Sequence, residues 1–214
     1  MLLNIYKKLL NFFGKQNWWP AESRYEVVVG AILTQNTSWK NVEKAIQNLK
    51  SYDLLDEYKI LDVEEEKLKE LIKPAGFYNI KAKRLKNITF FIVNNYGNTE
   101  KLAKSKEDLT VLRNKLLAVK GVGKETADTI LLYALDRLSF VVDSYTKRLF
   151  NRLGVINSDD YDTIKYIFES SLPKDLELYK EYHALIVEHC KTFCRKKPNC
   201  KECFLKDICV RKCL

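Results

Sequence analysis

The sequence contains no apolar run long enough to cross a membrane, and its first residues lack the features of a targeting signal. Residues 1–13 carry lysines within an amphipathic pattern, whereas a signal peptide has an uninterrupted apolar core. Internal repeats and low-complexity linkers are also missing, so any domain boundary must lie inside a short connection. We therefore expect an intracellular, cytoplasmic protein with no membrane partner.

Strand signals are few, and the best is the apolar run at residues 140–142. Helical spacing is found almost everywhere. Trp39, Val42, Ile46 and Leu49 recur at three- and four-residue intervals after Ser38, which is placed to cap a helix. Further helical patterns run over residues 27–33, 64–72, 81–96, 109–119, 126–135, 145–153, 161–170 and 177–191. The sequence thus predicts an all-α fold.

Cysteine is missing from the first 189 residues, and all six cysteines fall in the last 25. Disulfides there would cross-link only the C-terminal segment and leave the rest of the chain unconstrained. A metal site fits this distribution of cysteines better.

Basic residues exceed acidic ones. There are 37 Lys and Arg against 28 Asp and Glu, which gives a formal net charge of +9. Such a charge favours a polyanionic partner such as nucleic acid, and the alternative is a lysine-rich surface with no partner.

The stretch Ala118–Leu131, "AVKGVGKETADTIL", joins two helical patterns through a turn with two glycines. Gly121 and Gly123 are expected to supply the positive φ angles of a tight hairpin and to leave backbone amides bare. Bare amides at a helix start bind anions, and Lys120 and Lys124 add charge suited to a phosphate diester. The alternative is an ordinary helical hairpin with a glycine C-cap.

Four segments together resemble the endonuclease III superfamily of DNA glycosylases. "GVGKETADTILLYAL" followed by "FVVDSYTKRLFNRLG" is similar to its helix-hairpin-helix, loop and aspartate. "GAILTQNTSWKNVEKAI" and "IKPAGFYNIKAKRL" resemble helices of its barrel, and the cysteine tail resembles its iron–sulfur loop.

This resemblance implies two helical domains. A barrel over residues 22–136 would contain the hairpin, and residues 1–21 with 137–214 would form a second domain with the aspartate and a C-terminal [4Fe–4S] cluster loop. A monomer associated with the nucleoid would bind damaged double-stranded DNA in the cleft between them, with Lys120, Gly121, Gly123, Lys124 and Thr126 at the DNA.

Asp143 is the residue that the resemblance makes catalytic. It stands three residues before Thr146, the position of an N-cap that accepts hydrogen bonds from the first amides of a helix. Those bonds and the helix dipole would hold it ionised, so that it could stabilise positive charge at C1′ of a flipped nucleotide and orient water. The alternative is that Asp143 only caps a helix.

Glu125 departs from the pattern of the enzymes that also cleave the DNA backbone. In those enzymes a lysine at this position forms a Schiff base, which a glutamate cannot do. The chain is therefore expected to be a monofunctional glycosylase, and its hairpin is most similar to the 3-methyladenine glycosylase III type, which removes alkylated purines such as 3-methyladenine or 7-methylguanine. The alternatives are a bifunctional glycosylase and lyase for oxidised pyrimidines and a non-catalytic DNA-binding module.

The resemblance also suggests residues for the base pocket. "NWWP" and "QNTSW" are similar to its pocket segments, so Trp18, Trp19 and Trp39 are candidates to stack on a cationic base. Gln35 stands where the family places a polar residue that fills the gap left by the extruded base. The alternatives are that the tryptophans are core anchors and that Gln35 is a helix-end amide.

The cysteine spacing is Cys194-x5-Cys200-x2-Cys203-x5-Cys209, which departs by one residue in its first gap from the usual spacing of the family. Four thiolates with a single CxxC suit a [4Fe–4S] cluster, whereas a zinc site usually shows two tight pairs, for which Cys209 and Cys213 are a weak second pair. This assignment leaves Cys190 and Cys213 without a part in the cluster. The role of the cluster would be structural.

Overall fold

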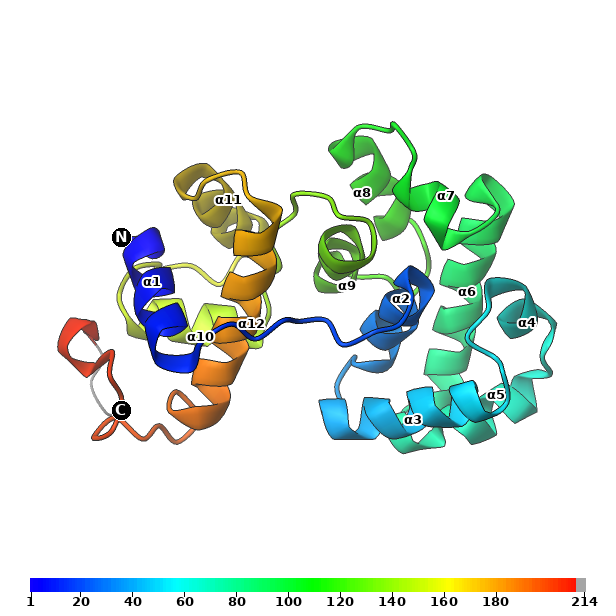
Figure 1. Cartoon of the computed structure of the whole chain (residues 1–214), viewed down its shortest axis with the longest axis horizontal. Coiled ribbons are helices and arrows are strands. Elements are labelled where there is room, and N and C mark those ends of the chain that lie inside the picture. Colours follow the sequence, from blue (N-terminus) through cyan, green and yellow to red (C-terminus); the bar gives the residue numbers. More distant parts are fainter. Residues whose placement is uncertain (211–214) are drawn as a thin grey trace. The chain divides into compact units, whose positions relative to one another are not determined.

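The computed structural model describes residues 1–210, and within that range it contains helices and loops and no strand (Figure 1). The α-helices are α1 (Leu2–Phe13), α2 (Arg24–Leu33), α3 (Trp39–Ser51), α4 (Glu57–Asp62), α5 (Glu65–Ile72), α6 (Tyr78–Tyr96), α7 (Thr99–Ala103), α8 (Leu109–Leu117), α9 (Lys124–Thr129), α10 (Ser144–Arg152), α11 (Tyr161–Ser171) and α12 (Leu176–Thr192). Short 3-10 turns lie at Lys73–Ala75 and Lys206–Ile208, and a π-helical turn lies at Ile130–Ala134. The all-α prediction is confirmed.

The chain folds into two compact units. The central unit is Trp19–Arg137, and the terminal unit joins Met1–Trp18 to the described residues from Leu138 onward.

The central unit is built around α2. Every residue from Tyr25 to Leu33 is buried, because this helix packs against α3, α6, α7, α9 and the π turn. Residues 27–33 of this helix carry no polar side chain, and a segment that is apolar on all sides belongs in a core. Ser23 caps it by accepting a hydrogen bond from the amide of Glu26. Ser38 holds the N-cap position of α3, but its side chain makes no capping hydrogen bond.

The terminal unit is built around α12, which packs against α1 and α10. Its core is rich in aromatic rings. Tyr179 and Tyr182 of α12 are fully buried, and Phe140 stacks on Phe168 of α11 with ring centroids 4.2 Å apart. Within residues 1–210, none of the helices combines the length and the apolar character needed to span a membrane.

Candidate functional site

Asp143 is the N-cap residue of α10. Its Oδ1 accepts hydrogen bonds from the amide and the hydroxyl of Thr146, at 2.7 and 2.9 Å. Its Oδ2 lies 3.5 Å from Nε2 of His183 on α12, and both side chains are buried. Burial raises the pKa of this carboxyl, but the contacts with His183 and Thr146 lower it by more. The net pKa is therefore below the usual value. Asp143 is therefore an ionised carboxylate in a buried position.

Trp18 lies in the same unit, against the same histidine. Its ring centroid is 5.9 Å from that of His183, and Nζ of Lys191 lies 5.7 Å from the Trp18 ring. His183 thus contacts both a predicted catalytic residue and a predicted pocket residue. The sequence reasoning missed it, although the chain has only two histidines.

Trp19 and Trp39 belong to the central unit, where they meet. Their ring centroids are 5.1 Å apart in an edge-to-face arrangement, and the ring of Tyr133 lies 5.4 Å from that of Trp19. A Cβ on Gly30 of α2 would lie 3.0 Å from Cζ2 of Trp19, so the missing side chain makes room for the indole. Tyr133 sits in the π-helical turn and was not foreseen from the sequence.

The hairpin between α8 and α9 uses its two glycines differently. Gly121 has a φ of +102°, as expected, but Gly123 has a φ of −93° and is the extended N-cap residue of α9. The expectation of a positive φ at Gly123 is therefore wrong: the helix start requires extended backbone there, and a Cβ at this position would meet no atom within 4 Å. Lys120, Lys124 and Glu125 are exposed around the turn.

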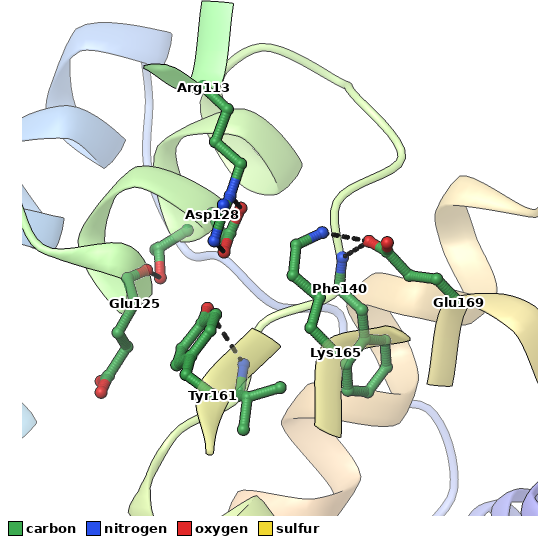
Figure 2. A network of polar contacts seen from close by, with 9 residues as sticks. Arg113, Glu125, Asp128, Phe140, Tyr161, Lys165 and Glu169 are labelled. Atoms are coloured by element: carbon green, nitrogen blue, oxygen red, sulfur yellow. Dashed lines mark hydrogen bonds and ion pairs between the residues drawn. The ribbon is translucent and has the colours of Figure 1, made fainter. Parts of the chain in front are cut away.

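Two sets of side chains brace this hairpin. Arg113 of α8 forms a two-bonded ion pair with the fully buried carboxylate of Asp128 on α9, at 2.8 and 3.0 Å (Figure 2). Arg84 of α6 packs across Gly121, where an added Cβ would lie 2.2 Å from its Cγ. Asn87 of α6 donates a hydrogen bond to the carbonyl of Lys120 at 3.0 Å.

Gln35 bonds to the hairpin within the central unit. Its Nε2 donates to the carbonyl of Gly121 and to Oγ1 of Thr126, both at 3.0 Å, and its Oε1 accepts from Arg84. Thr126 is buried, so its side chain is engaged inside the unit. Gln35 thus joins two other predicted residues, Gly121 and Thr126, directly, and Arg84, which the sequence reasoning missed, holds Gln35 from the other end of its amide.

The cysteines Cys194, Cys200, Cys203 and Cys209 line one cavity of about 190 Å³. Two arginines of α10 hold this loop. Arg148 donates to the carbonyl of Cys194 at 2.8 Å, and Arg152 contacts Sγ of Cys194 at 3.4 Å and donates to the carbonyl of Arg195 at 2.7 Å. Sγ of Cys209 lies 3.3 Å from the carbonyl of Arg152.

The four thiols differ in environment. The neighbouring Cys190 thiol lowers the pKa of Cys194 below its ordinary value, with Arg152 and Arg148 acting in the same direction. Cys190 is buried beside the carbonyl of Tyr145 and does not line the cavity. Cys213 lies outside the described residues. Within residues 1–210, no three His, Cys, Asp or Glu side chains converge closely enough for a single metal ion.

The chain is similar to known DNA repair proteins. A Methanocaldococcus jannaschii protein, named provisionally as a DNA repair glycosylase, is 71% identical over 213 residues, which cover 99% of this chain and 97% of that protein. Endonuclease III of Thermotoga maritima is 30% identical over 86% of this chain and 82% of its own length.

A solved structure is also similar. The H. pylori 3-methyladenine DNA glycosylase MagIII, crystallised with 1,N6-ethenoadenine, is 33% identical, with a TM-score of 0.77 over 89% of this chain and 97% of that one. The family model of the HhH-GPD superfamily base excision DNA repair proteins matches residues 29–174. The chain with the capped Asp143 and the glycine hairpin therefore belongs to the HhH-GPD superfamily of base excision DNA repair glycosylases.

Proposed function

We propose that this glycosylase is monofunctional and removes alkylated purines from double-stranded DNA. The observation that carries the proposal is Glu125, which stands exposed on the first turn of α9 where the lyase branch has its lysine. A carboxylate cannot form an imine with C1′, which favours water as the nucleophile. The 33% identity to the H. pylori 3-methyladenine glycosylase supports the same substrate class.

Asp143 would provide the charge that this reaction needs. An alkylated purine is a cation with a weakened glycosidic bond, so the enzyme needs little acid catalysis on the base. The transition state carries positive charge at C1′, and a buried, ionised carboxylate stabilises such charge far better than one in water. The hydrogen bonds from Thr146 fix one oxygen of Asp143 and keep it ionised.

The aromatic side chains would select the cationic base. Trp19, Trp39 and Tyr133 form one cluster, and Trp18 lies beside His183. A desolvated cation over an aromatic ring gains on the order of 1–2 kcal/mol per contact. Each tryptophan is proposed as a base-stacking residue on this ground.

The hairpin would hold the DNA backbone. Lys120 and Lys124 are exposed, and the open space at Gly123 lets a phosphate approach the first amides of α9. Gly121 shapes the turn, and Thr126 would contribute through its amide because its hydroxyl is bound by Gln35. If Gln35 fills the gap of the extruded base, it must exchange its present bonds for bonds to DNA.

Cys194, Cys200, Cys203 and Cys209 would hold a [4Fe–4S] cluster. Thiolates are the ligands of such clusters, all four cysteines line the same cavity, and a single CxxC suits a cluster better than a zinc site, which usually has two tight pairs. When bound, the cluster would cross-link the loop. Arg195 and Lys196, whose carbonyls Arg152 binds, would then lie with Lys197 and Lys201 where they can contact DNA phosphates.

A panel of duplexes, each with one lesion, tests the proposal. The purified protein should release 3-methyladenine or 7-methylguanine and leave oxidised pyrimidines in place. Release of oxidised pyrimidines with strand cleavage would favour the endonuclease III-like alternative. Tight binding to every lesion without release of any base would favour a binding module.

A further inference from the structure

The segment that leads into Asp143 is completely buried, yet it belongs to no helix or strand. Phe140, Val141 and Val142 are each at most 1% exposed. Backbone amides at such depth must find partners, and in this segment side chains provide them. The amide of Phe140 donates to Oε1 of Glu169 at 2.8 Å, and the amide of Val142 donates to the hydroxyl of Tyr161 at 3.4 Å.

Both acceptors come from one stripe of α11. Tyr161, Lys165 and Glu169 are spaced four residues apart, which places them on one face of the helix. Lys165 donates to the same oxygen of Glu169 that accepts from Phe140, and Tyr161 and Lys165 are buried (Figure 2). The ring of Phe140 stacks on Phe168 of the same helix.

A buried stripe of polar side chains is an expensive way to stabilise a fold, because an apolar replacement of similar volume often serves as well. Here the stripe pairs the amides of alternate residues in a segment that ends at Asp143. The carboxylate is fixed on its other side by Thr146 and approached by His183. The backbone before Asp143 is thus held by α11 and the backbone after it by α10.

Resting on the proposed role of Asp143, we infer that Tyr161 and Glu169 are positioning residues for excision, which act through the backbone of Phe140–Val142. They do not touch substrate. Their effect on the rate arises because a carboxylate displaced by a fraction of an ångström stabilises the charge at C1′ less well.

The first test is Tyr161→Phe, which deletes the hydroxyl alone. At saturating enzyme, the single-turnover excision rate should fall roughly tenfold while the Kd for the same duplex stays within about twofold. Two matched controls exist. Tyr166→Phe changes an exposed tyrosine of α11, and Tyr179→Phe changes a buried tyrosine whose ring lies 5.5 Å from that of Phe140. Both should excise at the wild-type rate.

The second test determines whether position 169 needs a hydrogen-bond acceptor or a negative charge. Glu169→Gln with Lys165→Met keeps a carbonyl oxygen for the amide of Phe140 and leaves no buried ammonium unpaired, so its rate should approach that of the wild type. Glu169→Leu with Lys165→Met keeps no acceptor and should be slow. Equal rates in these two double variants would overturn the role of Glu169.

A cycle with Asp143→Asn separates positioning from general stability. Once the carboxylate is gone, adding Tyr161→Phe should lower excision no further, because the two residues act as a unit. If Tyr161→Phe lowers the excision rate of Asp143→Asn as much as it lowers that of the wild type, its role is merely structural. The same holds if Tyr179→Phe loses as much excision rate as Tyr161→Phe. If the wild-type protein excises no alkylated purine, the proposed function fails. If it excises and Tyr161→Phe is unimpaired, only this inference fails.

Discussion

Nε2 of His183 lies 3.5 Å from Oδ2 of Asp143, and the ring of that histidine lies 5.9 Å from the Trp18 ring. The carboxylate therefore has one oxygen committed to Thr146 and one facing an imidazole. This division lets Asp143 stay ionised in a buried place, because the contacts with His183 and Thr146 outweigh the effect of burial on its pKa.

Replacing Asp143 by Asn should abolish most excision and spare binding. The amide keeps the size of the side chain but lacks the charge that stabilises C1′. We expect the single-turnover rate to fall by a factor of order 10² or more, equivalent to about 2.7 kcal/mol, with the Kd for damaged DNA nearly unchanged. Asp160→Asn is the matched control, since Asp160 caps α11 in the same way. Near-wild-type excision by Asp143→Asn would reduce Asp143 to a cap.

The lowered pKa of Asp143 predicts that the free energy of unfolding depends on pH. The pKa of Asp143 is lower in the folded protein than the value of about 3.9 in an unfolded chain, so its carboxylate stabilises the fold above that pH. The stabilisation is lost as the pH falls through the folded pKa. Urea unfolding of the wild type and of Asp143→Asn should therefore differ most near neutral pH and converge below pH ~4. A gap that widens on acidification would contradict the lowered pKa.

The two hairpin glycines should respond differently to alanine. Gly121→Ala places a Cβ at a φ of +102° and 2.2 Å from Cγ of Arg84, so it should cost about 1–3 kcal/mol in free energy of unfolding and weaken DNA binding. Gly123→Ala meets no atom within 4 Å at a φ of −93° and should cost less than about 1 kcal/mol. Urea titrations of both variants, with DNA affinity at one salt concentration, decide the matter; equal losses would refute the assigned geometry.

Glu125 predicts that the product keeps an intact abasic site. Borohydride added during the reaction should trap no protein–DNA adduct, and the strand should break only on later treatment with alkali or heat. Glu125→Lys would present an ammonium from the exposed turn of α9, and a weak trapped band is expected from it. A strong band with the wild-type protein, lost on mutation of some other lysine, would overturn the monofunctional assignment.

The cysteine loop predicts iron. Purified protein should be yellow-brown and contain about four irons per chain if a [4Fe–4S] cluster is intact. Cys203→Ser should lower the iron content, whereas Cys190→Ser should retain it because Cys190 does not line the cavity. A folded, active and colourless protein with one zinc would exclude the cluster.

Much of the fold could be read from local patterns. The apolar body of α2 at residues 27–33 and the amphipathic α3 follow directly from residue spacing, and the distance of Asp143 from Thr146 predicts its role as an N-cap. Such features depend on residues within one or two helical turns of each other, so they can be predicted from the local sequence. The aspartate caps of α4, α8, α11 and α12 are of the same kind.

Contacts between distant segments could not be read in this way. Nothing near His183 indicates that it faces Asp143, forty residues earlier in the chain. Arg84 is one of many basic residues, and only the fold brings it onto Gly121. The π turn at Ile130–Ala134 has no sequence period of its own, so the helical pattern was extended through it. Gly123 was misjudged because two glycines in one turn need not share one conformation.

Helix α10 has only nine residues, and it carries Asp143 at its start and Arg152 in its last turn. Between Thr146 and Arg152 lie somewhat less than two turns, roughly 9 Å of hydrogen-bonded backbone. The cysteine loop bonds to this helix at Arg152 and also at Arg148, which lies only two residues from Thr146 and donates to the carbonyl of Cys194. Amide exchange after damage to the loop should accordingly quicken at Arg148 as well as at Arg152, so the short helix links the cysteine loop to the end of the unit that carries the carboxylate.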